Sequence, residues 1–194
     1  MNKEDAKYQF DFWTDTLGLE HTFSFDEAWD FMYYRNPNTS VDKAESFSPA
    51  KYTKKEFQKG ILKVENKMRK SDKTIQDKKE IDAINPVKHL FADGCYIREI
   101  FNPAGEFIVT KIHKYSSPFF LLKGCMTILS EEGEKRIRAP HYGITVAGTK
   151  RIIYAHEDCI FVTVHRTDKT TIEEAENEII AKNFEDVNGR CNCK

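Results

Sequence analysis

A change of pattern near Asn85 constrains the fold of this chain more than any other feature of its sequence. From there to Thr167, short runs rich in β-branched and aromatic residues are separated by turn-forming residues. Spacings of about 8–12 residues between turns are typical of an all-β sandwich or barrel. The expected strands are 95–101, 107–113, 119–122, 126–129, 135–138, 144–146, 151–154 and 159–165. About this number of strands fits a jelly roll.

The segment before the barrel has a helical pattern instead. Ser24 with Glu27, and Thr53 with Glu56, are capping boxes that predict helix starts. Residues 36–50 and 72–84 are expected to be connectors, the latter a linker or a fraying helix end. A third capping box, Thr171 with Glu174, predicts a C-terminal helix over 172–183. We therefore expect a helical extension with a linker over 1–84 and a barrel with a C-terminal helix over 85–194.

Charge and hydropathy exclude some functions. The net charge of −1 is unlike that of most nucleic-acid-binding proteins. The basic stretch 51–79 is then either a solvated helix face or a surface for an anionic partner. No apolar run approaches the ~20 residues of a membrane helix, and the first residues lack the apolar core of a signal peptide. We expect a cytoplasmic protein that binds neither nucleic acid nor membrane.

Five cysteines add little evidence of chemistry. An odd count without a signal peptide argues against a disulfide framework. Cys95, Cys125 and Cys159 lie in expected strands, where we interpret them as small buried hydrophobes. Cys191 and Cys193 lie in a polar tail without nearby residues to complete a metal site.

Two runs within the barrel carry a family resemblance. Ile108-Val-Thr-Lys-Ile-His113-Lys-Tyr115, continuing to Leu-Leu-Lys-Gly124, resembles the first cupin motif. Ala139-Pro140 with Val146-Ala-Gly-Thr-Lys-Arg151 resembles the second. Together with the strand ending in His165, they resemble small cupin-like proteins encoded by tailed bacteriophages. The resemblance implies an α+β, mainly β fold: a cupin-type double-stranded β-helix (jelly roll), with the N-terminal helical extension and C-terminal helix added. It also implies a phage setting, in the host cytoplasm or on the virion, and a homodimer.

The resemblance also shows which metal ligands are replaced. Cupins hold iron, manganese or zinc with two histidines on one strand, a later glutamate and a third histidine. His113 takes the first of these positions and Tyr115 the second. The glutamate falls at Phe119 or Phe120, and the third histidine at Arg151, a permanent cation. We therefore expect no metal and no other cofactor.

Alternation along strands predicts what fills the barrel in place of a metal site. The candidate ligand-binding residues are His113, Tyr115, Arg151, Phe119, Thr163 and His165. Two interpretations stay open. Arg151 and its neighbours bind a small anion, or Arg151 pairs at the barrel mouth with Glu157, Asp158 or Glu99.

Three hypotheses about function follow. The first is a non-catalytic protein that binds a small anionic ligand or a protein partner, with no catalytic residues. The second is a structural or interaction component, docking through aromatic residues of the N-terminal helices, with Trp13, Trp29, Phe31 and Tyr33 at the interface. The third is a metal-dependent cupin enzyme with a non-standard site.

Overall fold

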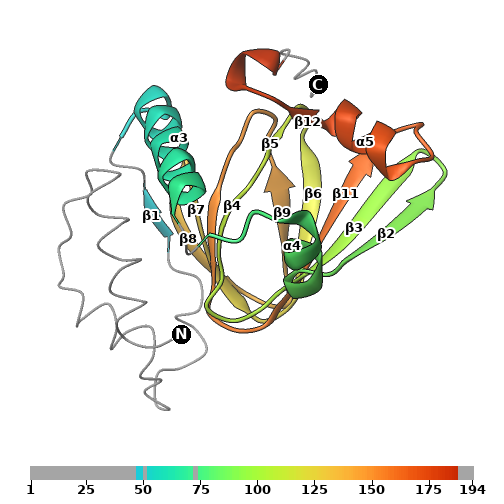
Figure 1. Ribbon diagram of the computed structural model, residues 1–194, viewed down its shortest axis with the longest axis horizontal. Coiled ribbons are helices and arrows are strands. Elements are labelled where there is room, and N and C mark those ends of the chain that lie inside the picture. The colour runs from blue at the N-terminus through green and yellow to red at the C-terminus, as the bar shows by residue number, and fades with distance from the viewer. Residues whose placement is uncertain (1–46, 50–51, 72–73, 188–194) are drawn as a thin grey trace.

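A computed structural model describes residues 47–49, 52–71 and 74–187, and two five-stranded antiparallel sheets form most of that part (Figure 1). The first sheet contains, in spatial order, β1 (Phe47–Pro49), β8 (Gly133–Arg138), β7 (Cys125–Ser130), β10 (Ile152–Ala155) and β4 (Phe107–Val109). The second contains β2 (Val87–Ala92), β3 (Cys95–Asn102), β11 (Cys159–Arg166), β6 (Ser117–Lys123) and β9 (His141–Thr145). A short pair joins β5 (Ile112–His113) to β12 (Ile180–Ala181).

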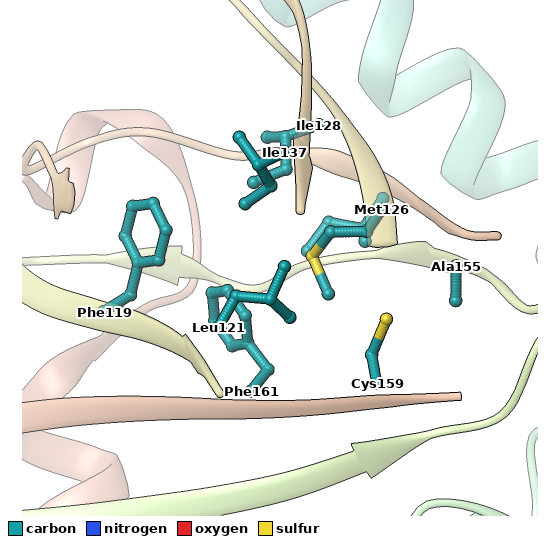
Figure 2. Packing of buried hydrophobic residues seen from close by; sticks show 9 residues of the cluster. Phe119, Leu121, Met126, Ile128, Ile137, Ala155, Cys159 and Phe161 are labelled. Carbon is teal, nitrogen blue, oxygen red and sulfur yellow. The ribbon is translucent and has the colours of Figure 1, made fainter. Parts of the chain in front are cut away.

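The two sheets enclose the main hydrophobic core between them. Along β11, residues at alternate positions from Cys159 to His165 are buried, as expected for a strand with one inward face. The inward side chains of both sheets meet in one cluster (Figure 2): Phe119, Leu121, Met126, Ile128, Ile137, Ile153, Ala155, Cys159 and Phe161. The prediction of a mainly β fold with a barrel of antiparallel strands is thereby confirmed. Cys125 and Cys159 are buried and free, as predicted, whereas Cys95, also predicted to be buried, is free but only half-buried at the start of β3.

In the described residues, three α-helices accompany the sheets: α3 (Lys54–Lys70), α4 (Lys78–Ile84) and α5 (Ile172–Ile179). The Thr53 hydroxyl oxygen accepts a hydrogen bond from the Glu56 backbone N–H, and the Glu56 carboxylate accepts one from the Thr53 N–H. The predicted capping box therefore caps the N-terminus of α3. Thr171 caps α5 in the same position. Within the described part of the chain, no helix combines the length and the apolar character of a bilayer-spanning segment.

Helix α3 packs on the outer face of the first sheet. Its apolar stripe, Phe57, Ile61 and Val64, is buried against Leu129 of β7 and Ile152 of β10. Burying each such side chain contributes roughly 1.5–3 kcal/mol to stability. Strand β1 pairs with β8 on the same sheet. Part of the segment predicted as an extension therefore packs on the barrel. Residues 1–46, 50–51 and 72–73 of that segment lie outside the described residues, as do Cys191 and Cys193.

Several boundaries differ from the sequence-based expectation. The strand predicted over 107–113 divides into β4 and β5, because Thr110 and Arg151 bond across the loop between them. The C-terminal helix ends at Ile179, where the chain extends to pair with β5. Residues 78–84, predicted as linker or fraying helix, form α4 with Asp77 as its N-cap. Strand β2 was not predicted. Its side chains are half-buried or exposed in the structure, so it is not a buried strand of the core.

Candidate anion-binding site

A cavity of about 1140 Å³ is lined by inward residues of both sheets and by residues of α4. In Figure 1, α4 lies across the open side between the two sheets. Strands of both sheets contribute to its wall, as do α4 and α5. Its charged lining residues are Lys78, Asp82, Arg98, Glu106, Lys111, Arg151 and Glu176. Its apolar lining includes Ile81, Ile84, Val87, Ile100, Phe107, Ile108, Ile153 and Phe161. The cavity therefore combines an apolar wall with a small number of charged groups, as ligand sites commonly do.

Arg151 occupies this cavity from the residue directly before β10. Its backbone N–H donates to Thr110 Oγ1 at 2.9 Å, which fixes the start of the strand. Its guanidinium lies over the Phe119 ring, with Cζ 5.1 Å from the ring centroid, and Nη2 donates to the Ile144 carbonyl at 3.4 Å. The Nε–H is buried without a hydrogen-bond acceptor. Burial lowers the pKa of Arg151, a sign that its charge is poorly solvated.

The carboxylates that line the cavity are already engaged. Asp82 pairs with Lys78 at 2.8 Å. Glu176 pairs with Arg98 at 3.7 Å and Lys111 at 3.4 Å. Glu106 accepts from Asn85 Nδ2 at 2.6 Å, and burial raises the pKa of Glu106. Among the described residues that line the cavity, Arg151 is thus the cation without a carboxylate partner.

The expected alternative for Arg151, an ion pair at the barrel mouth, is not what the structure has. Glu157 forms a two-point ion pair with Arg138, at 2.8 and 3.0 Å. Asp158 accepts from the backbone of Ala104, and Glu99 pairs with Lys88. Each carboxylate considered from the sequence is therefore committed elsewhere, and the negative charges that act on Arg151 are those of Glu131 and Glu132.

His113 and His165 form a neutral pair beside Arg151. Their rings meet edge to face at 5.1 Å, one from β5 and one from β11. Burial, followed by the nearby His165 and the cations Arg98 and Arg151, lowers the pKa of His113 to about 3. Burial and Arg98 lower the pKa of His165 to about 4. His113 Nδ1 is buried without a partner, so it is a polar atom available to a ligand in the cavity.

The predicted site residues divide into three groups. His113, Arg151 and Thr163 line the cavity together. Phe119 and His165 lie behind them: Phe119 supports Arg151, and His165 Nε2 contacts Thr163 Oγ1 at 3.1 Å. Tyr115 does not join them, since its side chain is 43% exposed and does not line the cavity. Strand β5 ends at His113, so strand alternation does not carry to Tyr115. The predicted interface residues Trp13, Trp29, Phe31 and Tyr33 lie outside the described residues.

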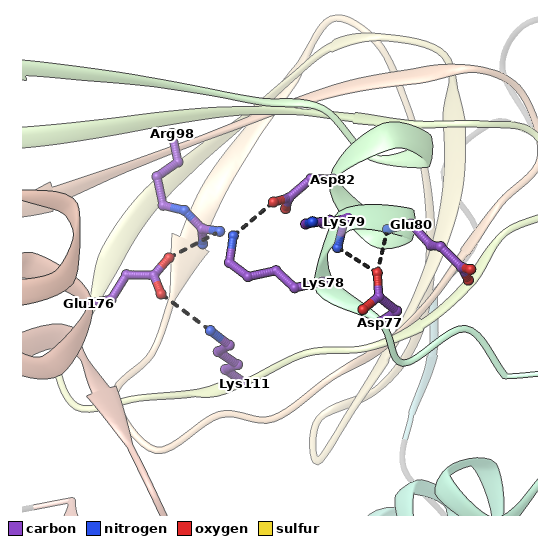
Figure 3. Close-up of polar contacts among 8 residues, drawn as sticks. All are labelled: Asp77, Lys78, Lys79, Glu80, Asp82, Arg98, Lys111 and Glu176. Carbon is purple, nitrogen blue, oxygen red and sulfur yellow. Dashed lines mark hydrogen bonds and ion pairs between the residues drawn. The ribbon is translucent and has the colours of Figure 1, made fainter.

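Sequence reasoning missed a second charged group at the cavity mouth. Figure 3 shows Glu176 of α5 between Arg98 of β3 and Lys111, with the Lys78–Asp82 pair of α4 nearby. Arg98 Nε is also buried without a partner. The spacing in the sequence could have located Arg98. It is two residues from Tyr96, so both side chains lie on the same face of β3, and Tyr96 is buried in the structure.

The donors around the cavity do not fit the metal that cupins hold. In the described part of the chain, no three residues of the types His, Cys, Asp or Glu are grouped closely enough to ligate one ion. His113 and His165 are adjacent, but the position expected for another ligand carries the Arg151 cation, which repels a divalent metal. The polar groups that the described residues offer to this cavity include the cation Arg151, the His113 ring and the Thr163 hydroxyl.

Comparisons with known proteins give no assignment of family or activity. No protein-family model and no curated protein matches this chain. Among solved structures, KdgF from Halomonas sp. is similar over 48% of this chain and 87% of its own, at 11% identity and a TM-score of 0.41. A cupin 2 domain-containing protein from Halorhodospira halophila is similar over 52% and 77%, at 10% identity and 0.40. Protein NMB1881 from Neisseria meningitidis is similar over 49% and 100%, at 15% identity and 0.37. One fold hosts many functions, so these likenesses assign no activity to this chain.

Proposed function

We propose that this protein is a non-catalytic binder of a small organic anion, held in the cavity between its two sheets. The observation that carries the proposal is the state of Arg151, which lines the cavity with a buried and unpaired Nε–H. Among the described residues, Glu131 and Glu132 act on its charge from a distance, but neither forms an ion pair with it. A buried cation without a partner is costly. A ligand carboxylate that accepts from this guanidinium removes that cost and gains charge-assisted hydrogen bonds.

The remainder of the cavity wall favours an anion with an apolar body over a bare inorganic ion. Ile100, Ile108 and Phe161 lie on the same inner faces as Arg98, Arg151 and Thr163. Each methylene that a ligand buries there contributes roughly 0.8 kcal/mol. His113 Nδ1 and the Thr163 hydroxyl offer neutral polar contacts near the charged end.

Binding without catalysis is supported by the state of the reactive groups. Burial raises the pKa of Cys159 to about 11, so its thiol is not an available nucleophile at neutral pH. The low pKa of His113 makes it a weak base, and among the described residues no carboxylate bonds to its ring. The phage setting implied by the sequence resemblance stays a prediction.

Titration calorimetry with the full chain tests the proposal. Hexanoate and benzoate carry an apolar body, whereas acetate and inorganic phosphate do not. We expect saturable binding of hexanoate and benzoate, at least tenfold tighter than binding of acetate or phosphate. No heat of binding for any of the four anions would contradict the anion site. Equal affinity for hexanoate and acetate would contradict the role given to the apolar wall.

A further inference from the structure

A second arginine, Arg98, lines the same cavity as Arg151. The register of the second sheet pairs Arg98 of β3 with Thr163 of β11, and Thr163 in turn with Phe119 of β6. The guanidinium of Arg151 lies over the Phe119 ring. Because neighbouring strands lie about 4.8 Å apart, the Cα atoms of Arg98 and Phe119 are about 10 Å apart. One short row across the inner face of the sheet therefore has an arginine side chain at each end and Thr163 between them.

His113 lies within the electrostatic reach of both arginines. After burial and the nearby His165, the charges of Arg98 and Arg151 are the next causes that lower the pKa of His113. Nδ1 of the same ring is buried without a partner in the cavity that both arginines line. Both cations thus act on one part of the cavity, so a ligand of modest length can reach them together.

The hydrogen-bonding capacity of Arg98 is only partly used. Its Nε–H is buried without an acceptor. Its contact with the Glu176 carboxylate, at 3.7 Å, is an ion pair that is longer than a hydrogen bond. Glu176 is also shared with Lys111, at 3.4 Å. Arg98 can therefore bind a second carboxylate while Glu176 stays paired with Lys111.

The Arg98 side of the cavity has more cations than carboxylates among the described residues that line it. Figure 3 shows the cations Lys78, Arg98 and Lys111 with the carboxylates Asp82 and Glu176. The charge of Glu176 also acts on Lys78, so these groups belong to one electrostatic cluster. An additional carboxylate that enters this cluster would meet an excess of positive charge, which favours its binding.

An apolar pair lies beside the row that joins the two arginines. Ile100 of β3 and Phe161 of β11 pair with each other, two residues along their strands from Arg98 and Thr163. They share the inner face with that row and line the cavity. A ligand that crosses from one arginine to the other can therefore bury a chain of methylene groups against them.

We propose that the ligand of this cavity is a dicarboxylate, with one carboxylate bound to Arg151, the other bound to Arg98, and an apolar chain between them. This inference rests on the proposed function, because Arg151 holds one end of the ligand in both. A monocarboxylate on Arg151 leaves the buried Nε–H of Arg98 without an acceptor. A second carboxylate satisfies that donor and adds charge-assisted hydrogen bonds.

Titration calorimetry of the full chain with adipate and hexanoate tests the inference. The two acids have the same carbon chain, and adipate has a carboxylate where hexanoate has a methyl group. We expect adipate to bind the wild type at least about tenfold more tightly than hexanoate, because it adds hydrogen bonds to a charged group. Arg98→Gln should remove this preference and leave hexanoate affinity within about threefold of the wild type.

Arg166→Gln is the matched control, because Arg166 is exposed at the end of β11 and does not line the cavity. It should keep the full preference for adipate. Arg98→Lys, which keeps the charge but loses the Nε–H, should bind adipate with an intermediate affinity. Thermal unfolding without ligand checks that each variant is folded, and the comparison of the two acids on the wild type needs no variant.

The outcomes separate this inference from the proposed function. If hexanoate binds and adipate binds no more tightly, the anion site stands and the dicarboxylate is wrong. If the preference for adipate survives in a folded Arg98→Gln variant, Arg98 does not hold the second carboxylate and the inference is overturned. If neither acid binds the wild type, the anion site itself is wrong and this inference falls with it.

Discussion

The guanidinium of Arg151 lies over the ring of Phe119, with Cζ 5.1 Å from the ring centroid. Phe119 is held in place from two sides. It stacks on Phe161 at 5.2 Å, and it faces Gly143, where an added Cβ would come within 2.8 Å of the ring. The aromatic platform thus fixes the orientation of a cation that lacks a carboxylate.

A double-mutant cycle measures what this contact contributes. We expect Phe119→Leu to lower the free energy of unfolding by about 1–3 kcal/mol, because a large core side chain shrinks. The interaction energy between Phe119→Leu and Arg151→Gln in the cycle should be about 0.5–2 kcal/mol, as for a partly desolvated cation–π pair. Chemical denaturation of the four proteins gives the value. A coupling of zero would mean that the ring and the guanidinium are neighbours without interacting.

Glu176 is expected to compete with a bound anion. Its carboxylate is shared by Arg98 and Lys111 at the mouth of the cavity. Glu176→Gln removes this internal negative charge, so hexanoate should bind several-fold more tightly in calorimetry. Glu173→Gln, an exposed change on the same helix, is the control and should leave affinity unchanged. Weaker binding by Glu176→Gln would show that the carboxylate supports the site.

The neutral histidines predict acid sensitivity. The pKa values of His113 and His165 are about 3 and about 4 in the folded chain, below the ~6.5 of an unfolded chain. As pH falls, these histidines therefore bind protons in the unfolded state before they do so in the folded state. The resulting stability is fully present above about pH 6.5 and is lost as pH falls toward 4, by up to ~1.4 kcal/mol per pH unit for each histidine.

Denaturation curves between pH 4.5 and about 7.5 check this expectation. Burial raises the pKa of Glu106, so this group changes stability with pH in the opposite direction. Subtracting the pH profile of His113→Gln from that of the wild type isolates the contribution of His113. The variant should lose stability less steeply on acidification. Parallel pH profiles for the two proteins would contradict the assignment of His113 as buried and neutral.

Helix α3 should be part of the cooperative unit of the barrel. Ile61 is fully buried against the first sheet, so Ile61→Ala should cost about 2–5 kcal/mol in the free energy of unfolding. Leu62, the next residue, is 40% exposed, and Leu62→Ala should cost about 0.5 kcal/mol or less. Thermal and chemical unfolding of both variants make the comparison. Equal, small effects would mean that α3 is detached from the barrel.

The sequence predicted what depends on local periodicity. Runs rich in β-branched and aromatic residues between turn signals located β3, β6, β7 and β11, and capping boxes located the starts of α3 and α5. Strand β2 was missed because its side chains are half-buried or exposed, so its pairing with β3 rather than its own pattern makes it a strand. The same limit applies to β12, which exists because β5 offers it an edge.

For the site, alternation correctly directed His113 and Thr163 into one cavity but failed at Tyr115, beyond the end of β5. The ion pairs were the less predictable part. Local sequence does not say that Arg138 takes Glu157, or that Glu176 of α5 reaches Arg98 across 78 positions of chain (176 − 98 = 78). Such pairings depend on the tertiary fold, and they are what leaves Arg151 without a carboxylate.

The most direct test of the central claim is the affinity of the full chain for hexanoate with and without the Arg151 cation. Calorimetry should show saturable binding to the wild type and a loss of at least tenfold in Arg151→Gln. Arg138→Gln, which changes an arginine paired with Glu157 outside the cavity lining, should bind as the wild type does. If Arg151→Gln bound hexanoate with wild-type affinity, Arg151 would not be the anchor and the proposed function would be wrong.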